Sequence, residues 1–142
     1  MADWTVTHLY HSGFAVELRD RVLIFDWYRG ELPEFSPDKS VFVLVSHRHE
    51  DHYSWDIWNL RNEYPDLRYI VDKDVPLGEY RKLPNVHRVR AKQTYEIDGV
   101  TIRTLKSTDT GVAFFLEAEG LRILHAGDLN VGYWEDEPME DN

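Results

Sequence analysis

The side chains best suited to chemistry lie in one short polar segment, Ser-His-Arg-His-Glu-Asp-His at positions 46–52. Four potential metal ligands fall within six residues of it: His47, His49, Asp51 and His52. A neutral imidazole offers a nitrogen lone pair and a carboxylate offers an anionic oxygen, a mixture that suits zinc or a similar divalent ion. The chain contains no Cys, so any metal must rest on His and carboxylate ligands.

The sequence on either side predicts how these ligands are held. An apolar run at 41–45 predicts a buried strand, and residues 54–64 predict an amphipathic helix that ends before Pro65. The four ligands then lie on a loop, from which their side chains can reach two neighbouring metal positions. The alternative is a polar loop whose His residues only cap the helix, which the specificity of the motif disfavours.

The spacing H-x-H-x-D-H resembles that of the metallo-β-lactamase superfamily. This resemblance implies that His47 and His49 serve one metal, while Asp51 and His52 serve a second. It also implies that Asp128, at the end of the apolar strand predicted at 121–125, bridges the two metals. A turn or helix-capping Asp is the alternative for Asp128.

Two departures from the family pattern stand out. Alignment on the strand that begins Gly111-Val112-Ala113-Phe114 places Ser107 where the family has its third His for the first metal. Ser is a poor zinc ligand, so Asp109 is the candidate replacement, or this metal binds weakly or is absent. The later His of the second metal would lie beyond Asn142. The resemblance therefore implies an αββα sandwich of the α/β (α+β) class that is incomplete at its C-terminal end, about three-fifths of the family fold.

Several further residues are candidates for the surroundings of the metals. The resemblance, including that to the ascorbate-6-phosphate lactonase branch, suggests that His11 faces the site, although a purely structural role in its turn is equally open. Asp26, at the end of a predicted strand, is a candidate hydrogen-bond acceptor for a ligand imidazole. Trp27 and Tyr53 could border a substrate pocket, but aromatic side chains more often pack in a core. His125 is expected to be structural or to support a ligand.

The remaining sequence predicts mostly strands, with a loop at 27–39 and another at 72–84 that holds one helical turn. Asp98-Gly99 and Glu119-Gly120 predict tight hairpins. The predicted strands span 4–10, 14–18, 21–26, 41–45, 67–71, 86–90, 93–97, 100–105, 111–118 and 121–125.

Composition sets wider limits. The 142 residues, 42% hydrophobic and 30% charged, predict one soluble globular domain over 1–142 with an acidic tail at 135–142. A net charge of −10 makes nucleic acid an unlikely partner. No signal sequence and no apolar run long enough to span a membrane is seen, which predicts a cytoplasmic protein.

Together these features predict a metal-dependent hydrolase that cleaves an ester, lactone or phosphodiester bond of a small molecule with a metal-activated water. Asp51 would bind metal and orient that water. One or two Zn²⁺ ions are the expected cofactor, with Mn²⁺ or Fe²⁺ as alternatives. A non-catalytic scaffold that acts by binding or assembly and a nucleic-acid-processing hydrolase are the rival functions. An exposed sheet edge would favour self-association.

Overall fold

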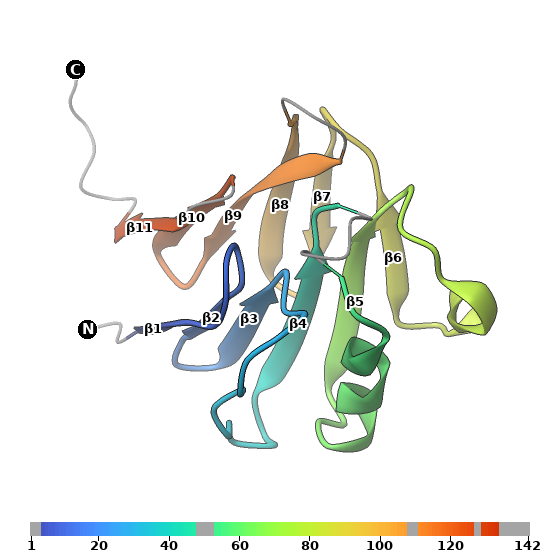
Figure 1. The fold of residues 1–142 in the computed structure, drawn as a ribbon. Helices are drawn as coiled ribbons and strands as arrows, with labels where there is room; N and C mark the ends of the chain where they lie inside the picture. Colours follow the sequence, from blue (N-terminus) through green and yellow to red (C-terminus); the bar gives the residue numbers. More distant parts are fainter. Residues whose placement is uncertain (1–3, 48–52, 108–110, 127–128, 134–142) are drawn as a thin grey trace.

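The computed structural model describes residues 4–47, 53–107, 111–126 and 129–133, and it forms two stacked β-sheets (Figure 1). In these residues the strands are β1 (Thr5–His8), β2 (Phe14–Glu17), β3 (Arg21–Phe25), β4 (Ser40–Val45), β5 (Leu67–Asp72), β6 (Val86–Val89), β7 (Thr94–Ile97), β8 (Val100–Lys106), β9 (Val112–Ala118), β10 (Leu121–His125) and β11 (Leu129–Tyr133), and the helices are η1 (Trp55–Asn62) and η2 (Gly78–Lys82).

The first sheet has the order β1-β2-β3-β4-β5-β6, and the second has the order β11-β10-β9-β8-β7. Strands β1, β2 and β3 form an antiparallel meander, whereas β3 to β6 run parallel to one another. All strands of the second sheet are antiparallel. The carboxyl ends of β3, β4 and β5 therefore meet at one edge of the first sheet.

The central strands of the first sheet are apolar on both faces because each face packs against another layer. In β4, Val41 and Val43 face the cluster that includes η1, while Phe42 and Leu44 face the second sheet. The core between the two sheets is completed by side chains such as Phe114 of β9. This pattern explains why the run at 41–45 shows no polar alternation.

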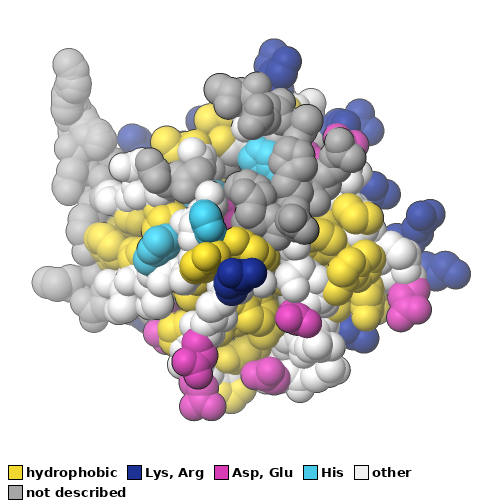
Figure 2. All heavy atoms as spheres, in the orientation of Figure 1, with side chains coloured by type: hydrophobic (Ala, Val, Ile, Leu, Met, Phe, Trp, Pro, Cys, Tyr) yellow, Lys and Arg dark blue, Asp and Glu magenta, His cyan; other side chains and the backbone are white. Residues whose placement is uncertain are grey.

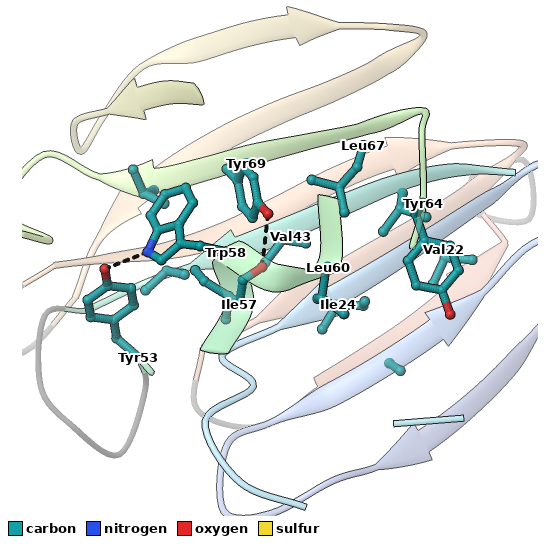
Figure 3. Close-up of a cluster of buried hydrophobic side chains, with 14 of the residues drawn as sticks. Val22, Ile24, Val43, Tyr53, Ile57, Trp58, Leu60, Tyr64, Leu67 and Tyr69 are labelled. Atoms are coloured by element: carbon teal, nitrogen blue, oxygen red, sulfur yellow. Dashed lines mark hydrogen bonds between the residues drawn. The ribbon is translucent and has the colours of Figure 1, made fainter. Parts of the chain in front are cut away.

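The layer that covers the first sheet is built around Trp58 of η1 (Figure 3). Its ring stacks on Tyr80 at 4.6 Å, and its indole N–H donates to the Tyr53 hydroxyl at 3.0 Å. The Tyr69 hydroxyl donates to the Ile57 carbonyl at 2.9 Å. These contacts fix η1 on the sheet directly after the predicted ligand loop.

The helix expected at 54–64 is present, but it is a 3₁₀ helix rather than an α-helix. Ser54 caps its start by accepting from the Asp56 backbone N–H at 3.1 Å. The Ile57 carbonyl accepts from the Tyr69 hydroxyl of β5, and the Trp58 carbonyl accepts from the Arg61 guanidinium within the helix.

Both predicted hairpin turns are confirmed. Asp98 and Gly99 have φ values of 48° and 86°, and Glu119 and Gly120 have φ values of 52° and 79°. Positive φ at both central turn residues matches the twist of the flanking strands. Strand β11 was not predicted, since its sequence Leu-Asn-Val-Gly-Tyr is short and contains both Asn and Gly.

The predicted sandwich of two sheets is confirmed, with one helical layer that lies over the first sheet. Within the described ranges, no helix covers the outer face of the second sheet. No helix in these ranges is long and apolar enough to cross a bilayer.

Candidate metal-site edge

The candidate site lies at the edge where β3, β4 and β5 end and where the second sheet approaches the first. The two sheets join there directly, because the Val112 backbone N–H donates to the Ser46 carbonyl at 3.0 Å. Figure 2 shows His side chains among hydrophobic atoms on this face, with Lys and Arg side chains both near them and toward the edges.

Of the predicted metal ligands, only His47 lies within the described residues. His49, Asp51, His52, Asp109 and Asp128 lie outside them, so their assignment as ligands stays a prediction. The described residues alone contain no group of three or more metal-binding side chains.

Asp26 is fully buried directly behind His47. Its carboxylate accepts from the Ser46 backbone N–H at 2.7 Å and from the Ser46 hydroxyl at 2.5 Å. Its φ of 48° lies in the left-handed region, which Asp adopts more readily than most residues other than Gly. The carboxylate therefore lies one hydroxyl away from the first predicted ligand.

Ser46 connects this carboxylate to the imidazole. Its hydroxyl oxygen lies 2.7 Å from Nδ1 of His47. An ionised carboxylate only accepts, so the single hydroxyl proton goes to Asp26, and the Ser46 oxygen then accepts from Nδ1–H of His47. This order leaves Nε2 of His47 with its lone pair, the form in which an imidazole binds a metal.

Ser107, which stands in place of the family's His, lies beside the same nitrogen. Its hydroxyl oxygen is 3.3 Å from Nε2 of His47. The end of β8 therefore reaches the site, as the alignment predicts, and it brings a hydroxyl there. Whether Asp109 contributes in addition lies outside the described residues.

The position of His47 also depends on Gly111. The sequence identified Gly111 only as the first residue of a predicted strand. Gly111 has a φ of 87°, and an added Cβ would lie 2.1 Å from the Ser46 carbonyl oxygen and 2.9 Å from the His47 ring. Only Gly permits both this backbone conformation and this approach. A Gly next to a predicted ligand strand was the only signal available.

A second buried carboxylate, that of Asp72, lies near the site. The sequence did not predict a role for it. Asp72 ends β5 at the position beside Ser46, because Val71 and Val45 are register partners. Burial raises the pKa of the Asp72 carboxyl above its usual value; a hydrogen bond from the Asp74 backbone N–H opposes this rise, while the negative charge of Asp74 adds to it. A buried carboxylate at the end of a parallel strand next to β4 was a usable signal.

His125 reaches the back of the site, in agreement with its predicted structural or supporting role. It is 1% exposed, stacks on Phe25 at 4.8 Å and donates from Nε2 to the Ser12 carbonyl at 2.7 Å. The same nitrogen lies 3.9 Å from the Asp26 carboxylate. It thereby ties the turn between β1 and β2 to the second sheet.

The other candidates lie around this centre in different ways. His11 is exposed and its ring contacts Tyr10 at 4.4 Å. Trp27 is partly buried and donates from its indole N–H to the Gly30 carbonyl at 2.9 Å. Tyr53 is 7% exposed and its hydroxyl donates to the Pro76 carbonyl at 2.8 Å, while burial raises its pKa. Tyr53 therefore acts through packing, and its hydroxyl proton is already engaged.

A family model described as a β-lactamase superfamily domain matches residues 5–138. The chain belongs to this family. It is 31% identical over 139 residues to a UPF0173 metal-dependent hydrolase of Korarchaeum cryptofilum, covering 90% of this chain and 61% of that protein. The chain thus spans about three-fifths of the length of this relative.

Two solved structures show the same fold. Igni18, described as a novel metallo hydrolase from Ignicoccus hospitalis, has a TM-score of 0.65 at 17% identity, covering 90% of this chain and 61% of that one. YhfI of Bacillus subtilis, a metallo-β-lactamase fold protein, has a TM-score of 0.58 at 20% identity, covering 87% and 60%. None of these three descriptions names a lactonase, so the ascorbate-6-phosphate lactonase branch stays a prediction.

Proposed function

We propose that this chain carries the ligand loop of a metal-dependent hydrolase. The observation that carries the proposal is the hydrogen-bonded series Asp26–Ser46–His47, which puts the imidazole proton of His47 on Nδ1 and a lone pair, the form that ligates a cation, on Nε2. Membership of the β-lactamase superfamily and the 31% identical metal-dependent hydrolase support the same reading.

The donor set of the loop suits a divalent metal, with Zn²⁺ first and Mn²⁺ or Fe²⁺ as alternatives. His47, His49, Asp51, His52 and Asp128 would hold one or two ions. A bound ion of this kind supplies Lewis acidity toward a scissile oxygen and lowers the pKa of water. The buried Asp26 supports this reading because a carboxylate behind a ligand imidazole fixes its tautomer and raises its basicity.

The chain's own residues would contribute orientation and proton handling. Ser46 holds the His47 ring at its Nδ1 side, and Gly111 lets β9 pack against that ring. Asp51 is proposed to orient the attacking water. Ester, lactone and phosphodiester bonds of small molecules are the proposed targets, because each presents an electrophilic carbon or phosphorus atom and an oxygen leaving group.

One observation favours a second candidate function. The Ser107 hydroxyl lies 3.3 Å from Nε2 of His47, where the family places another His. A hydroxyl can satisfy this nitrogen by a hydrogen bond without a metal. The rival function is therefore a scaffold that keeps the fold and acts by binding or assembly.

Metal content separates the two candidates. We would measure metal per chain by elemental mass spectrometry for the wild type and for an Asp51→Ala, Asp128→Ala double variant. A matched control is Glu31→Ala, Asp38→Ala, which removes two exposed acids. The hydrolase proposal expects about one to two metal ions in wild type and control, and loss in the double variant. Metal absent from all three proteins would favour the scaffold.

Self-association is also proposed. The sheets leave β1, β6, β7 and β11 with an unpaired side within the described residues. Unpaired strand edges offer backbone donors and acceptors to another chain. Sedimentation at several concentrations would test this, and a single monomeric species throughout would reject it.

A further inference from the structure

A cation in the loop that follows β3, Arg29, lies over two neighbouring aromatic rings whose centres are 5.8 Å apart. The guanidinium carbon of Arg29 is 5.0 Å from the ring centre of Tyr10 and 5.7 Å from that of Tyr28. Tyr10 is 37% exposed and Arg29 is exposed as well. Aromatic faces hold a guanidinium by cation–π attraction, which uses none of its N–H donors.

These donors have no acceptor among the described residues. No described carboxylate or carbonyl pairs with Arg29, whose contacts there are the two rings. A planar guanidinium presents up to five N–H donors in a geometry that matches the two oxygens of a carboxylate or phosphate. Because Arg29 is exposed, these donors face solvent, where an anion can take the place of water.

The surrounding backbone joins this cation to the candidate metal edge. A Cβ at Gly13 would lie 3.0 Å from the Asp26 carbonyl oxygen, and one at Gly30 would lie 3.1 Å from the Leu9 carbonyl oxygen. The turn between β1 and β2 therefore packs against the loop that follows β3. Asp26, at the start of that loop, also accepts from Ser46, the residue before His47.

His11 shares the same aromatic pair. Its ring lies 4.4 Å from that of Tyr10 and 6.2 Å from that of Tyr28. Its φ of 51° places it in the left-handed region, which His adopts more readily than most residues other than Gly.

We propose that Tyr10, His11, Tyr28 and Arg29 form an anion-recognition platform that binds a phosphate or carboxylate group of the substrate. Arg29 donates to the anion, the two Tyr rings hold the guanidinium in place, and His11 borders the same surface. The placement of the anion on a substrate rests on the proposed hydrolase function. Anion binding itself requires no metal.

The test is binding of small probes to the full chain after treatment with a chelator. Phenylphosphonate, phenylacetate and neutral phenylacetamide are titrated while backbone amide resonances are followed by NMR. We expect saturable shifts at Leu9, Gly13 and Gly30 for at least one anionic probe and none for the neutral probe. Arg29→Gln should raise the dissociation constant of that probe by about tenfold to a hundredfold.

The matched control is Arg103→Gln, which removes an exposed Arg from β8 of the second sheet and should bind like wild type. Arg29→Lys keeps the charge but loses the planar fork, so it should bind between wild type and Arg29→Gln. Tighter binding of the phosphonate or of the carboxylate identifies the anion. Absence of saturable shifts, equal shifts with phenylacetamide, or unchanged binding in Arg29→Gln would overturn the proposal, whatever the metal content of the protein.

Discussion

The Ser46 hydroxyl lies 2.5 Å from Oδ2 of the buried Asp26 carboxylate. The Ser46 hydroxyl oxygen also lies 2.7 Å from Nδ1 of His47. It therefore links the Asp26 carboxylate, just after β3, to the His47 imidazole, just after β4. Because a hydroxyl carries one proton, this relationship selects one tautomer of His47.

Ser46→Ala removes that link. We expect metal affinity to fall by about 10- to 100-fold, the usual effect of losing a group that orients a ligand imidazole. The Nδ1-protonated form of His47 should also lose its dominance, which nitrogen NMR of the imidazole would show in the metal-free protein. Ser36→Ala, at an exposed position, is the control. A variant that keeps both the wild-type affinity and the wild-type tautomer would rule out the link.

Gly111→Ala should disturb both the fold and the site. The new Cβ would meet the Ser46 carbonyl oxygen at 2.1 Å on a backbone with φ of 87°. We expect a loss of about 3 kcal/mol in the free energy of unfolding, from strain and overpacking together. Gly132→Ala is the matched control, because its Cβ would meet nothing within 4 Å. Urea unfolding of both variants measures the difference, and equal effects would contradict the explanation.

Local sequence signals predicted the sheets well. The Asp98-Gly99 and Glu119-Gly120 turns require positive φ within two adjacent residues, so the sequence itself carries the information. The strand at 41–45 was likewise evident from its continuous apolar run. The 3₁₀ form of η1 was not evident in this way, and the Tyr69 hydroxyl that donates to its Ile57 carbonyl comes from a different element.

The candidate site was predicted in its ligand types but not in its supports. Ser46 was part of the motif, yet its hydrogen bond to Asp26 depends on the parallel pairing of β3 and β4. Asp72 likewise comes to the site only because β5 pairs with β4. Such contacts join residues twenty or more positions apart, which periodicity and turn chemistry do not encode.

Asp72→Asn should not destabilise the metal-free protein at neutral pH. Burial raises the pKa of this carboxyl, so Asp72 contributes stability below its unfolded pKa, and that contribution is lost as pH rises through the folded value. The amide keeps an acceptor for the Asp74 backbone N–H, which lies 3.0 Å from the carboxylate. Urea unfolding at about pH 4 and about pH 7 should show that the free energy of unfolding of Asp72→Asn, relative to that of the wild type, is higher at the higher pH. Asp38→Asn, at an exposed position, is the control, and an Asp72→Asn variant that loses stability relative to the wild type as pH rises would refute this account.

Tyr69→Phe should weaken the attachment of η1 to the first sheet. The lost hydrogen bond to the Ile57 carbonyl is expected to cost about 1 kcal/mol in the free energy of unfolding. Burial raises the pKa of Tyr69 to about 12, so its contribution is complete below the unfolded value near 10 and is lost as pH rises toward 12. The wild type should therefore lose its advantage over Tyr69→Phe across that alkaline range. Unfolding curves combined with tyrosinate absorbance would measure this, with Tyr95→Phe, on β7 of the second sheet, as the control. An advantage that stays constant up to the highest pH would show that the Tyr69 hydroxyl is not held as the structure describes.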